Sequence, residues 1–417
     1  MKSKGQVFVD ELKARGFIYQ CTDVENLIGT LNVESNPAAY IGFDCTAKSL
    51  HVGNLMQIMI LRLMQRCGIR PVILVGGGTT KIGDPSDKDQ MRKMLSVEEI
   101  KSNIEGIKYS LSKFLDFSNP KTGAVLVNNA DWLDELNYLD FLRDYGKFFS
   151  INRMISFDKI KRRLEQEQNL TFLEFNYMIL QAYDYMHLNK KYNCILQCGG
   201  SDQWGNIVSG VDLVRRVNAK EVFGLTTPLI TTASGAKMGK TAEGAKWLNE
   251  SVLSPFDFYQ FWRNIDDADI FKFMRVYTEI PLDTVDEYQK DTNTNINEYK
   301  KLLAKEVTVL CHGKDIAENV HNQAINIFEN NNKSELNEVL IDSNIFKNEE
   351  VFAYELFRMA GLAQSNGEAK RLIVGNGAKI NDQKVSDEHH KILLADFVDG
   401  FIILSSGKKK HVKLVLS

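Results

Sequence analysis

The chain has 417 residues, of which 44% are hydrophobic and 25% charged. That length exceeds the range in which one hydrophobic core stays compact, so we expect two or three domains. Lys plus Arg total 51 and Asp plus Glu total 54, which argues against a protein whose overall charge attracts nucleic acid or membrane. A polyanionic partner would need a local basic patch.

The cysteines indicate reduced thiols. None stands in a CxxC pair, and in a chain this long the scatter is typical of a reducing, cytoplasmic compartment. Cys194 and Cys198 flank an apolar strand, which favours structural thiols over metal ligands, and we expect no metal site in the protein. No run approaches 18 apolar residues and the first thirty residues are charged throughout, so we expect a soluble, unprocessed protein without a membrane segment. The six cysteines are Cys21, Cys45, Cys67, Cys194, Cys198 and Cys311.

The first half of the chain alternates strands and helices. Residues 38–44 (AAYIGFD) predict a strand, 53–67 a helix that ends at Gly68, and 69–78 (IRPVILVGGG) a buried strand. A strand, helix, strand order implies a right-handed crossover and a parallel sheet.

The same alternation continues to the end of the first domain. Further strands are predicted at 124–130, 194–200 and 228–232 (PLITT), with helices at 172–188 and 203–217. The expected fold class is therefore α/β, with a doubly wound, Rossmann-like parallel sheet in residues 1–232.

The pattern then changes twice. Residues 233–328 begin with a glycine-bounded loop and become wholly helical, so we expect an α-helical domain there. The Asn-rich stretch 329–349 is typical of a flexible connector. Residues 350–417 predict a helix-turn-helix followed by short strands, a small α+β domain.

Four segments leave the predicted carboxyl ends of the strands, where doubly wound sheets bind ligands. None matches GxxxxGK[ST] or the GxGxxG spacing of dinucleotide folds. The segments are GFDCTAKSLHVGN (42–54), GGGTTKIGDPSDKDQMR (76–92), LQCGGSDQWGN (196–206) and SGAKMGKT (234–241).

His51 stands where a helix begins, and a ring nitrogen there can donate to an anion beside the positive end of the helix. Asn54, one turn on, adds amide donors. A single histidine at a helix start is more often a cap or a packed residue. Lys237 and Lys240, taken alone, read more readily as solvated charge on a surface loop.

The segments HVGN and KMGKT are more informative together than either is alone. HVGN at a helix start, with KMGKT later in the same α/β domain, resembles the HIGH and KMSKS signatures of class I aminoacyl-tRNA synthetases. YIGFDCTAKSLHVGN, LVGGGTTKIGDPS, FNYMILQAYDY, LQCGGSDQWGN and KMGKT are similar to the bacterial tyrosyl-tRNA synthetase pattern, over essentially the whole chain. The tail from about residue 350 is similar to an S4-type RNA-binding domain.

The resemblance implies a tyrosine–tRNA ligase, whose tyrosine pocket pairs the substrate phenol with Asp184 and Tyr40. Tyr177, Gln181 and Asp184 are spaced i, i+4, i+7, so one face of a helix presents all three. The alternative is that Tyr177 simply packs the core, but a glutamine and a carboxylate on that face count against it. The implied tyrosine-binding residues are Tyr40, Asp84, Asn129, Tyr177, Gln181, Asp184 and Gln203.

The resemblance also implies ATP as a substrate, with Mg²⁺, and no tightly bound cofactor. The tyrosine carboxylate attacks the α-phosphorus, so the protein supplies positioning and charge stabilisation rather than a nucleophile. The implied ATP-binding residues are Gly42, Asp44, His51, Asn54, Gly200, Asp202 and Lys240. The residues expected to assist catalysis are Thr46, His51, Asn54, Lys88, Arg92, Lys237, Lys240 and Thr241.

Three positions depart from the family pattern, and a fourth agrees with one branch of the family. Asn54 replaces the second histidine of the signature, and its amide can still donate to the ribose. Ile41 stands where some relatives have a cysteine, so that hydrogen bond is absent. Ala130 replaces a common aromatic residue beside Asn129. Gly239 suits the tyrosyl branch and permits a mobile loop.

The expected partners are tRNA(Tyr), L-tyrosine, ATP and a second copy of the chain, with no membrane. Residues 350–417 hold ten Lys plus Arg against eight Asp plus Glu, a balance of +2. Two rivals stay open, a tryptophan-activating enzyme and a catalytically silent relative that binds RNA. The basic residues of the tail, which charge alone would also explain as solvated, are Lys370, Arg371, Lys408, Lys409, Lys410 and Lys413.

Overall fold

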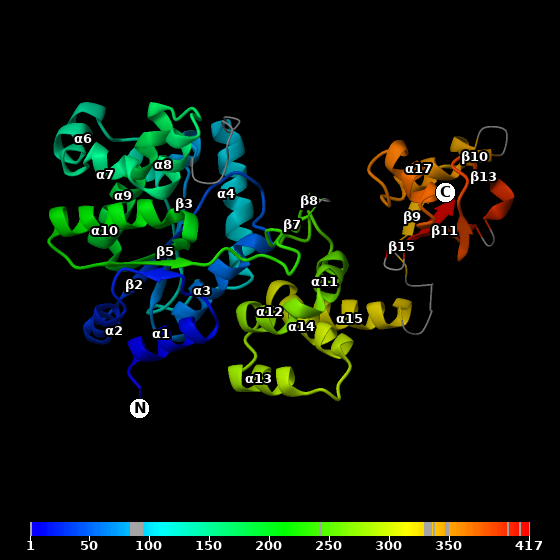
Figure 1. Cartoon of the computed structure of the whole chain (residues 1–417), viewed down its shortest axis with the longest axis horizontal. Helices are drawn as coiled ribbons and strands as arrows, with labels where there is room; N and C mark the ends of the chain where they lie inside the picture. The colour runs from blue at the N-terminus through cyan, green and yellow to red at the C-terminus, as the bar shows by residue number, and fades with distance from the viewer. Residues whose placement is uncertain are drawn as a thin grey trace. The chain divides into compact units, whose positions relative to one another are not determined.

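The protein is described from a computed structural model, in which the chain divides into two compact units, Met1–His321 and Asn322–Ser417. Figure 1 shows the chain in colours that run from blue at the N-terminus to red at the C-terminus. For residues 158–159, 240–241 and 328 the backbone alone is described. The described residues are 2–83, 95–241, 244–328, 336, 338–346, 350–397, 400–407 and 410–416.

Unit 1 is built on a six-stranded sheet with the order β1-β6-β5-β2-β3-β4. All neighbouring strands are parallel except the edge strand β1, which pairs antiparallel with β6. The order reverses between β2 and β5, which confirms the doubly wound sheet and puts the expected ligand crevice at their carboxyl ends. The strands are β1 (Gln20–Cys21), β2 (Ala38–Phe43), β3 (Arg70–Val75), β4 (Val125–Asn128), β5 (Cys194–Gly200) and β6 (Phe223–Thr227).

Helices cover both faces of this sheet. The helices α9 (Phe172–Tyr192) and α10 (Trp204–Asn218) contact β5 from one face, and α3 (Leu55–Arg66) contacts β2 and β3 from the other (Figure 1). The long helix α9 begins at a capping box formed by Thr171 and Glu174 and ends at Asn193 in the left-handed conformation. These caps fix where α9 begins and ends.

The remaining helices of unit 1 follow the predicted change from α/β to all-helical structure. The first group surrounds the sheet: α1 (Lys4–Ala14), α2 (Val24–Val33), α4 (Val97–Ser112), α5 (Ala130–Leu133), α6 (Tyr138–Asp144), α7 (Ile151–Ile155) and α8 (Asp158–Glu165). A short hairpin, β7 (Lys240–Thr241) and β8 (Gly244–Ala245), precedes the helical segment. That segment contains α11 (Pro255–Arg263), α12 (Ile270–Tyr277), α13 (Leu282–Lys290), α14 (Ile296–His312) and α15 (Lys314–Phe328), the last of which begins in unit 1 and ends in unit 2.

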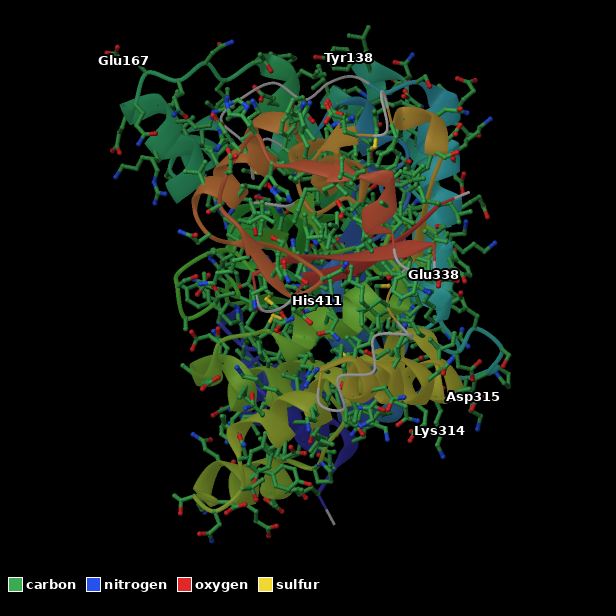
Figure 2. The ribbon with its side chains drawn as sticks, turned by 90° about the vertical axis from the view of Figure 1, so that its right-hand side faces the viewer. Tyr138, Glu167, Lys314, Asp315, Glu338 and His411 are labelled. Carbon is green, nitrogen blue, oxygen red and sulfur yellow. The ribbon has the colours of Figure 1, made fainter. Side chains whose placement is uncertain are left out.

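Unit 2 packs two helices against a five-stranded sheet with the order β12-β11-β14-β15-β9. The helix pair α16 (Ala353–Met359) and α17 (Asn366–Val374) precedes most of the strands, as expected. Figure 2 labels Glu338 of β9 and His411 of β15, which are neighbouring parallel strands. The strands of this sheet are β9 (Glu338–Ile341), β11 (Ala378–Ile380), β12 (Gln383–Val385), β14 (Phe401–Ser406) and β15 (Lys410–Leu416). Strands β10 (Glu350–Phe352) and β13 (Lys391–Leu393) pair antiparallel in a separate two-stranded sheet.

Two sequence expectations differ from the structure. Strand β9 lies inside the expected connector 329–349, because EVLI finds the free edge of β15, a pairing that local composition does not reveal. The last strand of the first sheet is Phe223–Thr227 rather than PLITT, because Pro228 has no N–H to donate to a ladder. The division of unit 1 at residue 232 stays a prediction. Among the described residues, no helix is long and apolar enough to cross a lipid bilayer.

Candidate active site

A cavity of about 350 Å³ opens at the carboxyl ends of β2 and β5. Its walls come from the end of β2, the turn that follows it, helix α9, the turn after β5 and the loop before β7, segments far apart in the sequence. The sequence-predicted residues that line it are Tyr40, Gly42, Asp44, His51, Asn54, Asn129, Tyr177, Gln181, Asp184, Gly200, Asp202, Gln203 and Lys237.

The other predicted site residues do not join this list. Thr46 is described, but its side chain is exposed and does not line the cavity. Asp84, Lys88 and Arg92 lie outside the described residues, as do the side chains of Lys240 and Thr241.

The inner end of the cavity holds a buried carboxylate. Asp184 is 1% exposed, and its two oxygens accept hydrogen bonds from different side chains. Asn129 Nδ2 donates to Oδ2 at 3.0 Å and Trp132 Nε1 donates to Oδ1 at 2.8 Å. Burial raises the pKa of Asp184 to about 7, and the bonds from Asn129 and Trp132 act in the opposite direction. At neutral pH the ionised form of Asp184 can therefore accept a hydrogen bond from a ligand.

Tyr40 lies beside this acid with its hydroxyl unused. Its ring is buried and packs edge-on against Tyr185, with 5.1 Å between the ring centroids. The hydroxyl oxygen is buried and makes no hydrogen bond to any residue in the described part of the chain. Burial, and after it the charge of Asp184, raises the pKa of Tyr40 well above its usual value, so its hydroxyl keeps its proton. A buried polar group without a partner costs free energy, which a bound ligand would relieve.

Polar side chains continue from the acid toward the mouth of the cavity. Tyr177 Oη donates to Asp44 Oδ1 at 3.3 Å. Asn206 Nδ2 donates to Gln181 Oε1 at 2.9 Å and to Gln203 Oε1 at 3.2 Å, which ties α10 to α9. The helix face predicted from Tyr177, Gln181 and Asp184 is confirmed, since all three line the same cavity.

The backbone after β3 is fixed to the acid end. Asn129 Oδ1 accepts from the backbone N–H of Gly78 at 2.8 Å, while its Nδ2 donates to Thr79 Oγ1 at 3.0 Å. The asparagine thus joins the glycine-rich turn to Asp184.

The HVGN turn presents an oriented imidazole. The backbone N–H of Gly53 donates to His51 Nδ1 at 3.0 Å, and the backbone N–H of His51 donates to Asn54 Oδ1 at 3.1 Å, a reciprocal cap. Because Nδ1 accepts, the neutral ring carries its proton on Nε2. Asn54 also lines the cavity.

The KMGKT loop lies directly against this turn. Gly239 has φ +82°, and a Cβ atom there would lie 2.6 Å from the backbone nitrogen of Gly53. A side chain at residue 239 would therefore be strained twice, by its backbone conformation and by the contact. Lys237 lines the cavity from the same loop.

Several lining or supporting residues escaped the sequence analysis. Trp132 holds Asp184 from a position 52 residues away, and no local pattern connects them. Gln197 pairs in register with Tyr40 on the neighbouring strand, so its inward direction follows once the register of β2 and β5 is known. Gln57 donates to Thr227 Oγ1 at 2.8 Å across the cavity wall.

Comparison with known proteins decides the family. Residues 32–329 match the family model described as tRNA synthetases class I (W and Y). The chain is 54% identical over 407 residues to a tyrosine–tRNA ligase of Rickettsia conorii, covering 97% of this chain and 98% of the relative. The chain belongs to the bacterial-type tyrosyl-tRNA synthetases.

Solved structures agree with this membership of the tyrosyl-tRNA synthetase family. A C-terminally truncated mitochondrial tyrosyl-tRNA synthetase from Aspergillus nidulans superposes with a TM-score of 0.69 and 28% identity, covering 77% of this chain and 94% of that one. A tryptophanyl-tRNA synthetase from Plasmodium falciparum, with a TM-score of 0.53, 14% identity and coverage of 76% of this chain and 87% of that one, shows the fold alone.

Proposed function

We propose that the cavity of unit 1 binds L-tyrosine and ATP side by side and forms tyrosyl-adenylate and pyrophosphate. The tyrosyl group then passes to the 3′ end of tRNA(Tyr), so the chain acts as a tyrosine–tRNA ligase, a class I enzyme of protein synthesis in the cytoplasm. The observation that carries the proposal is the buried pair of Asp184 and Tyr40 at the inner end of the cavity. A phenolic hydroxyl donates to the first and accepts from the second.

The same pair separates tyrosine from its nearest rivals. Phenylalanine and tryptophan present no hydroxyl here, so they would leave Asp184 and Tyr40 buried with an unpaired polar atom. In this proposal the α-amino group meets Tyr177 and Gln181, and the carboxylate points toward Gln203 and the nucleotide.

ATP lies across the carboxyl ends of β2 and β5. A Cβ atom at Gly42 would meet no described atom within 4 Å, so the backbone there is open to a nucleotide. A Cβ atom at Gly200 would lie 2.5 Å from Asp202 Oδ1, so a side chain there would displace that carboxylate. Asp202 accepts from the ribose, while His51 Nε2–H, Asn54 and Lys237 face the phosphates. The described residues hold no cluster of three or more His, Cys, Asp or Glu side chains suited to a metal. In the proposal Mg²⁺ arrives bound to the phosphate oxygens of ATP.

The test is ATP–pyrophosphate exchange with each of the twenty amino acids. We expect exchange with tyrosine and none above background with phenylalanine or tryptophan. Exchange with tryptophan would favour the other branch of the family, and exchange with no amino acid would favour a silent RNA-binding relative.

Unit 2 is proposed to contact the tRNA. Lys370 lies over the ring of Tyr354, 4.6 Å from its centroid, so this cation stands beside an aromatic face. Lys413 is less available, because its ammonium pairs with Glu338 at 2.6 Å. Deleting residues 350–417 should spare adenylate formation and impair charging of tRNA. An unchanged charging rate would remove this unit from tRNA recognition.

A homodimer is proposed from exposed apolar side chains on α6 to α9. Tyr138, which Figure 2 shows at the outer edge of unit 1, belongs to this set. Exposed apolar side chains on four consecutive helices favour a protein partner over water. Leu139→Asp should shift the molar mass measured by light scattering toward the monomer, whereas Val33→Asp, on exposed α2, should not. The set is Tyr138, Leu139, Ile151, Ile155, Leu164, Phe172 and Leu173.

A further inference from the structure

A buried amide connects three segments behind the phosphate end of the cavity. Asn249 is 2% exposed and lies downstream of the KMGKT loop. Its Nδ2 donates to the carbonyl oxygens of Lys48 at 3.2 Å and Gly106 at 3.0 Å, and its Oδ1 accepts from Ser110 Oγ at 2.8 Å. One side chain thus joins the turn before HVGN, helix α4 and its own segment.

The backbone reinforces this junction on both sides of His51. The N–H of Leu248 donates to Leu50 O at 2.9 Å, and the N–H of Val52 donates to Lys246 O at 2.8 Å. His51 therefore lies between two backbone bonds to the segment that follows the KMGKT loop. The imidazole of His51 also meets the Trp247 ring, with 5.9 Å between the centroids.

Helix α4 packs so closely against this junction that there is no room for a side chain at Gly106. A Cβ atom at Gly106 would lie 1.9 Å from Lys48 O, so the helix backbone touches the turn before HVGN directly. Along the chain, α4 follows residues 84–94, which include the predicted Asp84, Lys88 and Arg92. The amide at 249 is thus linked by direct bonds to the turn before HVGN and to α4, and along its own chain to KMGKT.

The chemistry of the junction requires an amide. Two backbone carbonyls face Nδ2, and carbonyl oxygens need a donor. A carboxylate of the same shape would turn an oxygen toward both carbonyls and bury a charge that no described cation bonds at this point.

We propose that Asn249 is a positioning residue for tyrosyl-adenylate formation, one that aligns the HVGN turn with the KMGKT loop. Asn249 does not line the cavity and acts through His51 and Lys237. The inference rests on the proposed function. It predicts that loss of the amide lowers the rate of the chemical step and leaves the tyrosine pocket, at the other end of the cavity, unchanged.

The test compares the full-length protein with Asn249→Ala, Asn249→Asp and Ser110→Ala by rapid quench, fluorescence titration and thermal unfolding. We expect the two Asn249 variants to lower the rate constant of adenylate formation at saturating substrates by at least about tenfold, since small misplacements carry large kinetic costs. Ser110→Ala, a milder change, should lower it less. The dissociation constant of tyrosine should change less than twofold in all three.

Asn189→Ala is the matched control. Asn189 is also buried, donates to Cys194 O at 3.0 Å and accepts from Asn218, but at the amino end of β5, away from the cavity. It should lower the unfolding temperature without changing the rate constant. The inference is overturned if Asn249→Ala and Ser110→Ala keep the wild-type rate constant, if Asn189→Ala lowers it equally, or if tyrosine binding weakens in proportion. A wild-type protein that forms no adenylate would instead overturn the proposed function. If Asn249→Ala does not fold, the Ser110→Ala rate constant decides between these outcomes.

Discussion

The two ends of the cavity are built differently. The inner end uses buried side chains on regular elements: Tyr40 on β2, Asp184 on α9, and Asn129 and Trp132 bonded to the acid. The outer end uses turns and a loop, with His51 and Lys237 partly or fully exposed. Rigid packing suits selection of a fixed shape, whereas exposed loops can follow phosphates that move during the reaction. Recognition and acceleration should therefore be separable by substitution.

The largest effect should come from the outer end. His51→Ala removes an oriented Nε2–H donor, so we expect the rate constant of adenylate formation to fall by about 10²-fold, the usual cost of losing one preorganised donor. Tyrosine affinity should be unchanged. Rapid-quench measurements at saturating ATP and tyrosine provide the check, and a rate constant equal to that of the wild type would remove His51 from the phosphate end.

An effect of similar size is expected at the inner end, on tyrosine binding rather than on the rate constant. Asp184→Ala removes the acceptor for the substrate phenol, so the dissociation constant of tyrosine should rise by about 10²-fold, as expected for a hydrogen bond to a charged group. ATP binding should change little. Equilibrium dialysis with each ligand measures both quantities, and parallel losses of the two would mean that the ends of the cavity are not independent.

A smaller effect is expected at Trp132, which donates a hydrogen bond to Asp184. Trp132→Phe keeps a flat ring but removes the 2.8 Å bond to Asp184 Oδ1. We expect tyrosine to bind about tenfold more weakly, because one donor that favours the ionised carboxylate is lost. His187 stacks on Trp132 with 4.3 Å between centroids and should hold the phenylalanine in place. Tyrosine titration followed by thermal unfolding separates this effect from a loss of stability.

The same contrast explains which parts of the site the sequence could predict. His51, Asn54 and Lys237 stand in short contiguous segments, and the i, i+4, i+7 spacing of Tyr177, Gln181 and Asp184 is a local property of one helix. Trp132 and Asn249 meet their partners across 52 and 201 residues, and such contacts depend on the register of the whole sheet. Strand β9 could not be predicted for the same reason, since its partner β15 lies at the other end of unit 2 in the sequence.

The smallest effect concerns pH. Burial raises the pKa of Asp184 from 3.8 to about 7, so the free protein gains stability from this group as pH falls from 7 toward 4, since the folded state then holds the proton more tightly. Tyrosine binding changes in the opposite direction, because the phenol donates best to the ionised carboxylate. Between pH 8 and pH 6 the ionised fraction falls roughly tenfold, and the dissociation constant of tyrosine should rise by up to about that factor.

Asp184→Asn supplies the control for the pH effect. An amide does not titrate, so tyrosine affinity in this variant should be weak and flat across the same pH range. Calorimetric titration at half-unit intervals measures both proteins. If the wild-type profile is flat as well, the acid is already ionised throughout, and the bonds from Asn129 and Trp132 outweigh burial at the inner end of the cavity.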